Sequence, residues 1–193
     1  MRLSEKFVSA VKIAAQAFGP AAMAAQWLDE IETGRIKERL DRLEDPLAKY
    51  GPKAKQLTAI LYSLIQAQPQ DVPSTHIDWT SELGPFIREL RQFEADGLLS
   101  GSHTITDAGF THGFRLINSS FIIYLAVLHD DPDKIAKLVG NLDDAKSQLI
   151  GTVVKQSIDL PLLVIDAFFK KYEEQGHGFK SREIGTCLYI PKP

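Results

Sequence analysis

The chain is poor in cysteine and has no excess of positive charge. Its 193 residues include one cysteine, Cys187, so no internal disulfide can form and no cysteine cluster can hold zinc. Lysine and arginine number 22 against 25 aspartate and glutamate residues, which gives a net charge of −3. The chain as a whole therefore has no positive field that would gather nucleic acid or anionic lipid. A reducing, cytoplasmic location is the expectation for such cysteine usage.

Long apolar runs are scarce as well. The most apolar stretch, Phe121 to Leu128, is far shorter than the roughly 20 residues of a membrane-spanning helix, and it predicts a buried helix instead. The alanine-rich residues 7–28 are interrupted by Lys12, Gln16 and Gly19-Pro20, which disfavours a secretion signal. The composition of residues 7–28 does not favour binding to a membrane surface, but such binding stays open as an alternative.

What the sequence does contain is an average globular composition with helical periodicity. Hydrophobic residues make up 44% and charged residues 24%, and the length is sufficient for a real core. The pattern predicts a mainly helical fold with one very small sheet. The expected helices are 4–18, 21–44, 53–67, 85–96, 107–129, 132–139, 144–157 and 159–174. The expected extended segments are 98–106 and one edge strand within 185–191, and residues 68–79 are not expected to be helical.

A narrow apolar seam runs along the second of these helices and just beyond it. Ile36, Leu40, Leu43 and Leu47 are spaced 4, 3 and 4 residues apart, as in a coiled coil. The seam is too short for a free-standing coiled coil, so it should pack on its own domain or on a second copy. We therefore expect residues 20–48 to mediate homodimerisation or docking of a protein partner.

The most informative pattern begins at residue 86. Phe86, Leu90 and Phe93 share one face of an amphipathic helix, and Gly97 is placed to end that helix in the left-handed conformation. Residues 98–99 then begin a strand.

The pattern continues through a tight turn at residues 100–102. Ile105 is expected to pair back after this turn, and the hydroxyl of Thr106 is expected to cap the following helix.

The phrases FEADGLL (93–99) and ITDAGF (105–110) resemble the winged helix-turn-helix of bacterial regulators such as the MarR and PadR families. In those families the recognition helix ends in Leu-x-x-x-Gly-Leu-Ile, and the wing returns into Leu-Thr-x-x-Gly. The resemblance covers residues 53–115 and implies that helix 85–96 is the recognition helix. It gives a mainly α fold with a winged-helix-like core and a tiny β-hairpin. Residues 1–50 would form a docking or dimerisation segment, and residues 116–193 a C-terminal helical segment with a short terminal strand.

The resemblance also implies which residues would contact DNA. The candidates are Arg88, Arg91, Arg115 and His103. Residues 85–115 hold three arginines and four acidic residues, a balance of 3 − 4 = −1, and Glu89 is expected to repel phosphate. We therefore expect weak, salt-dependent DNA binding that requires a dimer.

Residues that bear on catalysis have simpler interpretations. His129 to Asp133 looks like a metal cluster, but Asp131 before Pro132 is typical of a helix N-terminus. Cys187 is interpreted as a small buried thiol. We expect no enzyme activity, no metal and no cofactor.

Two functions stay open at this point. One is a DNA-binding transcriptional regulator that acts as a dimer. The other is a protein-interaction or accessory module that uses the winged helix as a scaffold. The first predicts a basic surface, and the second predicts an exposed apolar patch on the N-terminal helices.

Overall fold

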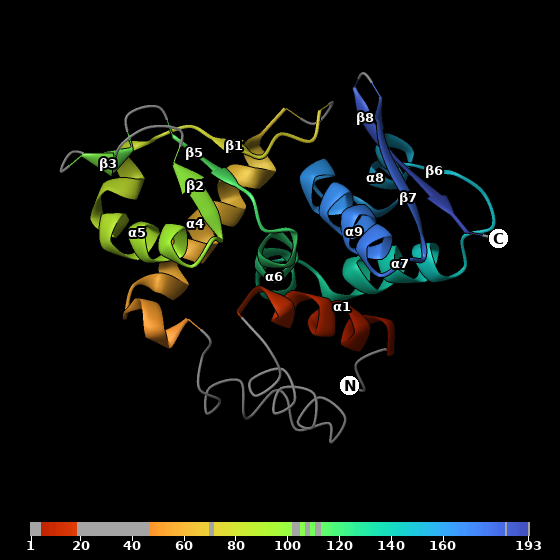
Figure 1. The fold of residues 1–193 in the computed structure, drawn as a ribbon, viewed down its shortest axis with the longest axis horizontal. Coiled ribbons are helices and arrows are strands. Elements are labelled where there is room, and N and C mark those ends of the chain that lie inside the picture. Colours follow the sequence, from red (N-terminus) through yellow and green to blue (C-terminus); the bar gives the residue numbers. More distant parts are fainter. Residues whose placement is uncertain are drawn as a thin grey trace.

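The computed structural model describes residues 5–18, 47–69, 72–101, 105–106, 109–110, 113–183 and 185–192. Over these residues the fold is mainly helical, as the periodicity predicts (Figure 1). The prediction of one very small sheet is wrong, because the described strands form two three-stranded sheets and a two-stranded one. The helices are α1 (Glu5–Ala15), α4 (Ala54–Ala67), α5 (Ile87–Ala95), α6 (Ser119–His129), α7 (Pro132–Asp143), α8 (Gly151–Ile158) and α9 (Leu162–Glu174). Short 3-10 segments are η1 (Gln16–Phe18), η2 (Ala48–Tyr50) and η3 (Ser81–Phe86). The strands are β1 (His76–Ile77), β2 (Leu99–Gly101), β3 (Ile105–Thr106), β4 (Gly109–Phe110), β5 (Phe114–Leu116), β6 (Leu149–Ile150), β7 (Gly178–Glu183) and β8 (Thr186–Pro191).

Helix α6 lies at the centre of the molecule in Figure 1. On one side of it is the first half, which contains α4, α5 and β1 to β5, and on the other side is the second half, which contains α7 to β8. Every residue from Ser119 to Ala126 is buried, and the helix packs against α1, α4 and α9. A helix that is apolar on all faces is stable in water only when other elements surround it. The Asn118 side chain caps its first turn by accepting a hydrogen bond from the Phe121 N–H at 3.1 Å. The buried helix predicted for Phe121 to Leu128 is confirmed.

The first half contains a three-stranded antiparallel sheet in the order β1-β5-β2. Helix α4 precedes β1 along the chain, η3 and α5 lie between β1 and β2, and the β3–β4 hairpin lies between β2 and β5. Phe114 and Leu116 of β5 are buried, whereas Arg115 between them is exposed. The alternation shows that one face of this sheet covers the core and the other faces solvent.

Helix α5 is anchored to the core as its periodicity predicts. Phe86, Leu90 and Phe93 are buried in the same apolar core as the α4 residues Leu57 and Leu61, with Leu64 partly buried beside it. The Phe93 ring lies edge-on to Tyr50 at 4.6 Å and to Phe121 at 5.2 Å between centroids.

The predicted left-handed cap at the end of α5 is present. Gly97 has a φ of +69°, and the Leu98 N–H donates to the Phe93 carbonyl at 2.9 Å.

The expected helix over 107–129 is wrong in its first part. Strands β4 and β5 occupy this region, and the helix begins only at Ser119. The alternating Phe114-Arg115-Leu116 pairs on both sides with β1 and β2, and that pairing outweighs the helical pattern. Thr106 lies in β3 opposite Gly109, so it is not a helix cap.

The boundaries after α7 also differ from the sequence prediction. Helix α7 continues to Asp143, and no helix spans 144–157, because β6 comes first and α8 begins at Gly151. An added Cβ at Gly151 would lie 2.4 Å from the Cys187 Sγ, so this close approach requires glycine. Asp159 adopts a left-handed φ of 58° and ends α8 rather than starting α9, which begins at Leu162.

The C-terminal residues form a second three-stranded sheet, in the order β6-β8-β7. We name it the C-terminal sheet. The expected edge strand is therefore wrong in its position, because β8 lies in the middle and pairs antiparallel with both neighbours. Helix α9 packs against β7 and β8. The Asp166 side chain of α9 pairs with Lys180 Nζ at 2.8 Å and with Arg182 at 3.0 Å.

Helix α1 packs its apolar face onto α6 and α7. Phe7, Ala10, Val11, Ile13 and Ala14 are all buried there. The apolar residues of 7–28 that the structure describes in α1 are thus covered by the chain itself. Among the described helices, none combines the length and the apolarity that crossing a membrane requires.

Replacing Leu90 with alanine tests the core beneath α5. Leu90 has no exposed surface, so Leu90→Ala should lower the free energy of unfolding by about 2–5 kcal/mol in urea denaturation. The exposed neighbour Arg88→Ala is the matched control, with an expected change within about 0.5 kcal/mol. Equal effects of the two variants would contradict the described packing.

Candidate nucleic-acid interface

Helix α5 presents its two arginines to solvent and turns its nearest acid inward. Arg88 and Arg91 are exposed, whereas Glu89 is only 4% exposed. Glu89 follows Phe86 by three residues and precedes Leu90, so it lies on the core side of the helix. Its Oε1 lies against Gly51, where an added Cβ would come within 3.3 Å. The Glu89 carboxylate is therefore not presented at the surface of α5, and its repulsion of phosphate stays a prediction.

The acids in the last turn of α5 and at its C-cap are bound to groups of the protein. Glu94 Oε1 accepts the Gly101 N–H at 2.8 Å and so ties α5 to β2. Asp96 Oδ2 accepts from Lys49 Nζ at 2.6 Å and from the Tyr50 hydroxyl at 2.8 Å. The Lys49 hydrogen bond, followed by that of Tyr50, lowers the pKa of Asp96. Asp96 is therefore neutralised locally by Lys49.

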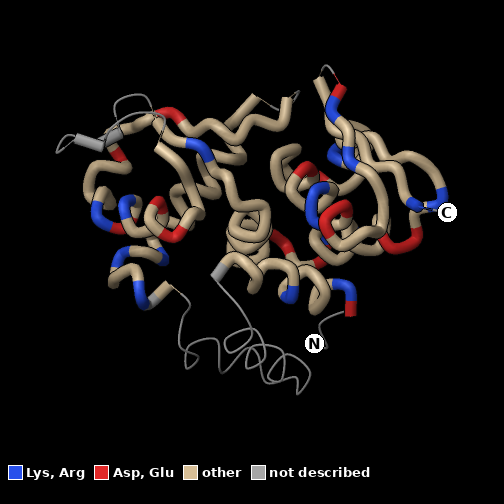
Figure 2. The backbone as a smooth tube through the Cα atoms, viewed as in Figure 1, with Lys and Arg blue, Asp and Glu red and all other residues tan. Residues whose placement is uncertain are grey.

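Two lysines that the sequence analysis missed lie at the ends of α5. Lys49 is held by Asp96 at the C-terminal end, and Lys53 Nζ lies 3.4 Å from the Pro85 carbonyl at the N-terminal end. We name Lys49, Lys53, Arg88 and Arg91 the α5 basic face. Figure 2 shows lysine and arginine on α5 and on the segment below it, with aspartate and glutamate between them. These contacts join residues 47 and 32 positions apart, so the only signal in the sequence was the close spacing of Lys49 and Lys53.

The remaining predicted DNA contacts do not lie on α5. Arg115 is exposed on the solvent side of the β1-β5-β2 sheet, opposite His76 on β1 and Ser100 on β2. The His76 Nε2 lies 3.1 Å from an Asp78 carboxylate oxygen. His103 lies outside the described residues.

The described part of the predicted interaction seam packs on the chain itself. Leu47 is 1% exposed and belongs to the core beneath α5, so it is not open to a partner. Ile36, Leu40 and Leu43 lie outside the described residues.

The approach to α5 differs from a helix-turn-helix. The sequence leaves room for about two turns at 78–84, and the structure has η3 there, with Pro85 inside it. Segment η3 ends at Phe86 and α5 begins at Ile87, so no turn separates them. Helix α5 has nine residues and is about 13 Å long.

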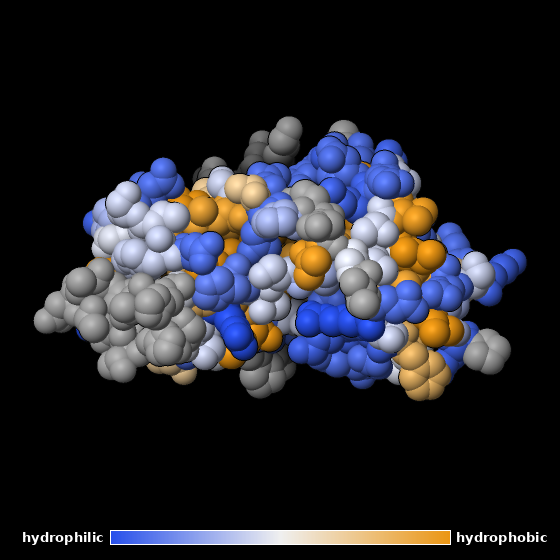
Figure 3. All heavy atoms as spheres, turned by 90° about the horizontal axis from the view of Figure 1, so that it is seen from above, coloured by the Kyte–Doolittle hydropathy of each residue, from blue (hydrophilic) through white to orange (hydrophobic). Residues whose placement is uncertain are grey.

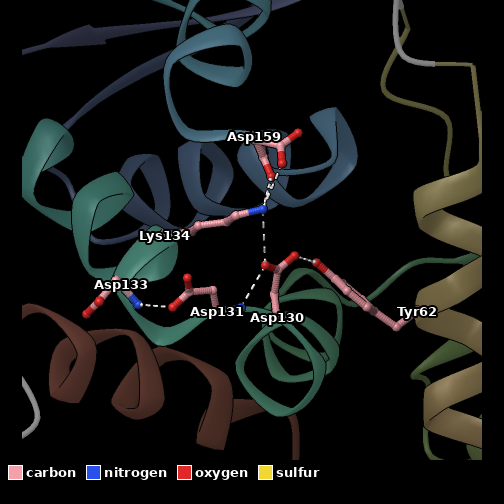
Figure 4. Close-up of polar contacts among 6 residues, drawn as sticks. All are labelled: Tyr62, Asp130, Asp131, Asp133, Lys134 and Asp159. Carbon is pink, nitrogen blue, oxygen red and sulfur yellow. Dashed lines mark hydrogen bonds and ion pairs between the residues drawn. The ribbon is translucent and has the colours of Figure 1, made fainter.

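A polar junction joins α4 to the second half of the chain (Figure 4). The Tyr62 hydroxyl donates to Asp130, whose side chain is 7% exposed and also accepts the Asp131 N–H at 2.7 Å. Lys134 Nζ lies 3.8 Å from Asp130 and 2.8 Å from Asp159. Burial and the Asp130 hydrogen bond raise the pKa of Tyr62, so this phenol stays a donor.

The His129 to Asp133 cluster is used for these contacts and for a helix cap. Asp131 Oδ1 accepts the Asp133 N–H at 2.9 Å, which confirms the predicted cap of α7. His129 Nε2 lies 3.0 Å from the Thr58 hydroxyl. In the part of the chain that the structure describes, no group of three His, Cys, Asp or Glu residues is placed to hold a metal ion.

Cys187 is a buried thiol, as expected. It has no exposed surface, and burial raises its pKa to about 12. A thiol with that pKa is protonated at neutral pH and is a poor nucleophile.

Comparison with known proteins identifies no relative of this chain. No family model, no curated protein and no solved structure matches the chain.

Removing the Tyr62 hydroxyl tests the polar junction. Tyr62→Phe leaves a largely buried carboxylate without one donor, so the free energy of unfolding should fall by about 1–3 kcal/mol. Ser63→Ala, which removes an exposed hydroxyl on the same helix, should change it by less than about 0.5 kcal/mol. If chemical denaturation shows no difference between Tyr62→Phe and wild type, Asp130 does not depend on this donor.

The pH dependence of stability tests the environment of His129. Burial, with a smaller effect of Lys55, lowers the pKa of His129 below its ordinary 6.5, so the unfolded chain binds this proton at higher pH than the folded protein. The free energy of unfolding should therefore fall as the pH is lowered from about 7.5 through 6.5. His129→Gln keeps a partner for Thr58 and should flatten that slope. Parallel pH profiles of the two proteins would contradict the assignment.

Proposed function

We propose that residues 53–115 form a winged-helix unit and that its α5 basic face binds the phosphate backbone of double-stranded DNA. The order of elements supports the fold: a helix, a strand, a helical pair, a strand, a hairpin and a strand. The third strand of this series, β5, lies between the other two in the antiparallel sheet. In the proposed unit FEADGLL would end the recognition helix, and the β3–β4 hairpin would serve as the wing.

The observation that carries the function is the split of charge across α5. Arg88 and Arg91 point to solvent while Glu89 points into the core. Two arginines three residues apart lie on the same edge of a helix, and Lys49 and Lys53 lie near its C-terminal and N-terminal ends. Arginine and lysine contacts to phosphate provide most of the sequence-independent affinity for DNA.

The geometry favours contacts to the backbone over base readout. Helix α5 is short, and η3 leads into it without a turn. The helix therefore does not extend away from the domain as the recognition helix of a helix-turn-helix does. Four basic side chains would make binding weak and strongly dependent on salt. Lys49 is already paired with Asp96, so three of these side chains would neutralise one phosphate each, and the affinity would then fall about 40-fold between 50 and 200 mM salt.

The absence of a turn between η3 and α5 disfavours base readout, and it is therefore compatible with a second candidate function that involves no DNA. In this alternative the winged helix is a scaffold, and the α5 basic face docks an acidic segment of a protein partner. The two candidates make opposite predictions for DNA.

A charge-reversal pair separates the candidates. Wild type should shift mixed genomic duplex fragments at about 50 mM salt, and Arg88→Glu with Arg91→Glu should abolish the shift, because phosphate would then meet two carboxylates. The matched control is Lys137→Glu with Lys146→Glu, which makes the same change in net charge at exposed positions remote in sequence. The control should keep the shift, and circular dichroism should show all three proteins folded.

Two outcomes would reject DNA binding at α5. A wild-type protein that shifts no fragment at low salt favours the scaffold function. A shift that survives the reversal of Arg88 and Arg91 places the DNA on another surface.

A further inference from the structure

The outer face of the C-terminal sheet exposes apolar side chains. Phe179 on β7 and Ile190 on β8 are direct partners in the register, and they are 58% and 45% exposed. Ile150 on β6 and Val153 in the first turn of α8 are 39% and 57% exposed. Figure 3 shows apolar side chains on the surface of the half that contains this sheet.

The direction of these side chains follows from the other face of the same strand. Lys180 and Arg182 reach Asp166 on α9, so their side of β7 faces the core. Side chains alternate along a strand, and Phe179, Ser181 and Glu183 therefore point away from α9. These three residues, with Ile150, Leu188 and Ile190, define what we call the outer face. Leu188 lies between Ser181 and Ile150 in the register and is only 4% exposed, so the exposed apolar side chains surround a buried centre.

Opposite charges lie at the two ends of the outer face. Lys192 Nζ lies 5.4 Å from the centroid of the Phe179 ring, at one end. Glu183 is exposed at the other end of β7, about 14 Å along the strand from Phe179. The apolar side chains thus lie between a cation and an anion.

We propose that the outer face is the contact surface for a second copy of this chain. A two-fold axis through the middle of the face would reverse one copy relative to the other. Lys192 of each copy would then lie over Glu183 of the other, with the apolar side chains between them. A surface that carries complementary charges at its two ends is self-complementary under a two-fold axis, as an isologous dimer requires.

The edge of the sheet favours stacking of faces over strand pairing. The Lys180 N–H, which lies on the free side of β7, donates to the Glu173 carboxylate at 2.9 Å. A strand added at this edge would have to displace that bond. The outer face does not include α5, so the dimer stands independently of the proposed DNA binding, and its formation would double the number of α5 basic faces in one particle.

Sedimentation of the full chain at about 100 μM tests the proposal. Wild type should sediment as a dimer, and Phe179→Ser with Ile190→Ser should sediment as a monomer with unchanged circular dichroism. Val72→Ser with Ile117→Ser removes two apolar side chains of similar exposure from the first half, and it should remain dimeric.

A charge swap makes the test specific to the predicted orientation. Lys192→Glu and Glu183→Lys should each weaken dimerisation by about three- to tenfold, because each creates two like-charge contacts in the symmetric pair. The double variant restores opposite charges, and its dimerisation constant should return to near that of wild type.

Three outcomes would overturn the proposal. The first is a wild-type chain that is monomeric at this concentration. If that monomer cosediments with phosphatidylglycerol vesicles, the outer face binds a membrane and not a second copy. The second is a dimer that survives Phe179→Ser with Ile190→Ser, which would place the contact elsewhere, as in residues 20–48. The third is a double charge variant that is no more dimeric than either single variant.

Discussion

The burial of helix α6 is the constraint on which the rest of the structure depends. Its residues from Ser119 to Ala126 are covered on all sides by α1, α4 and α9, which belong to both halves of the chain. Each large apolar side chain buried there stabilises the fold by about 1.5–3 kcal/mol, so separating the halves would expose a large apolar area. The contact of Phe93 with Phe121 joins α5 to this core. The position of α5 therefore depends on the packing of α6.

The carboxylates at the C-terminal ends of α6 and α7 accept hydrogen bonds from other elements. Asp130 accepts from Tyr62, and Asp143 accepts from Tyr172 at 2.7 Å and from Lys6 at 2.6 Å. Near α5 the acids that would oppose an anion are either buried or held by hydrogen bonds. Glu89 is buried, and Glu94 and Asp96 are held by hydrogen bonds. The α5 basic face thus gains its character from where the carboxylates are placed, since the net charge of the chain is −3.

The sequence predicted those features that local periodicity and caps determine. The apolar stripe of α5, the cap at Gly97, the cap at Asp131 and the buried α6 all follow from spacing and residue type. Residues 113–118 were mispredicted because Phe114-Arg115-Leu116 is compatible with both a helix and a strand, and only pairing with β1 and β2 decides between them. Lys49 and Lys53 lie beside α5 through tertiary contacts, and no local pattern records those.

Hydrogen exchange of the full chain with and without duplex DNA at about 50 mM salt tests the central claim most directly. In the free protein, the amides of α6 should exchange slowest, because they open only with the core. Addition of DNA should slow exchange in residues 49–53 and 87–95 and leave α7 to β8 unchanged. Unchanged exchange in both of those segments with DNA bound, or protection confined to another surface, would contradict a nucleic-acid interface on α5.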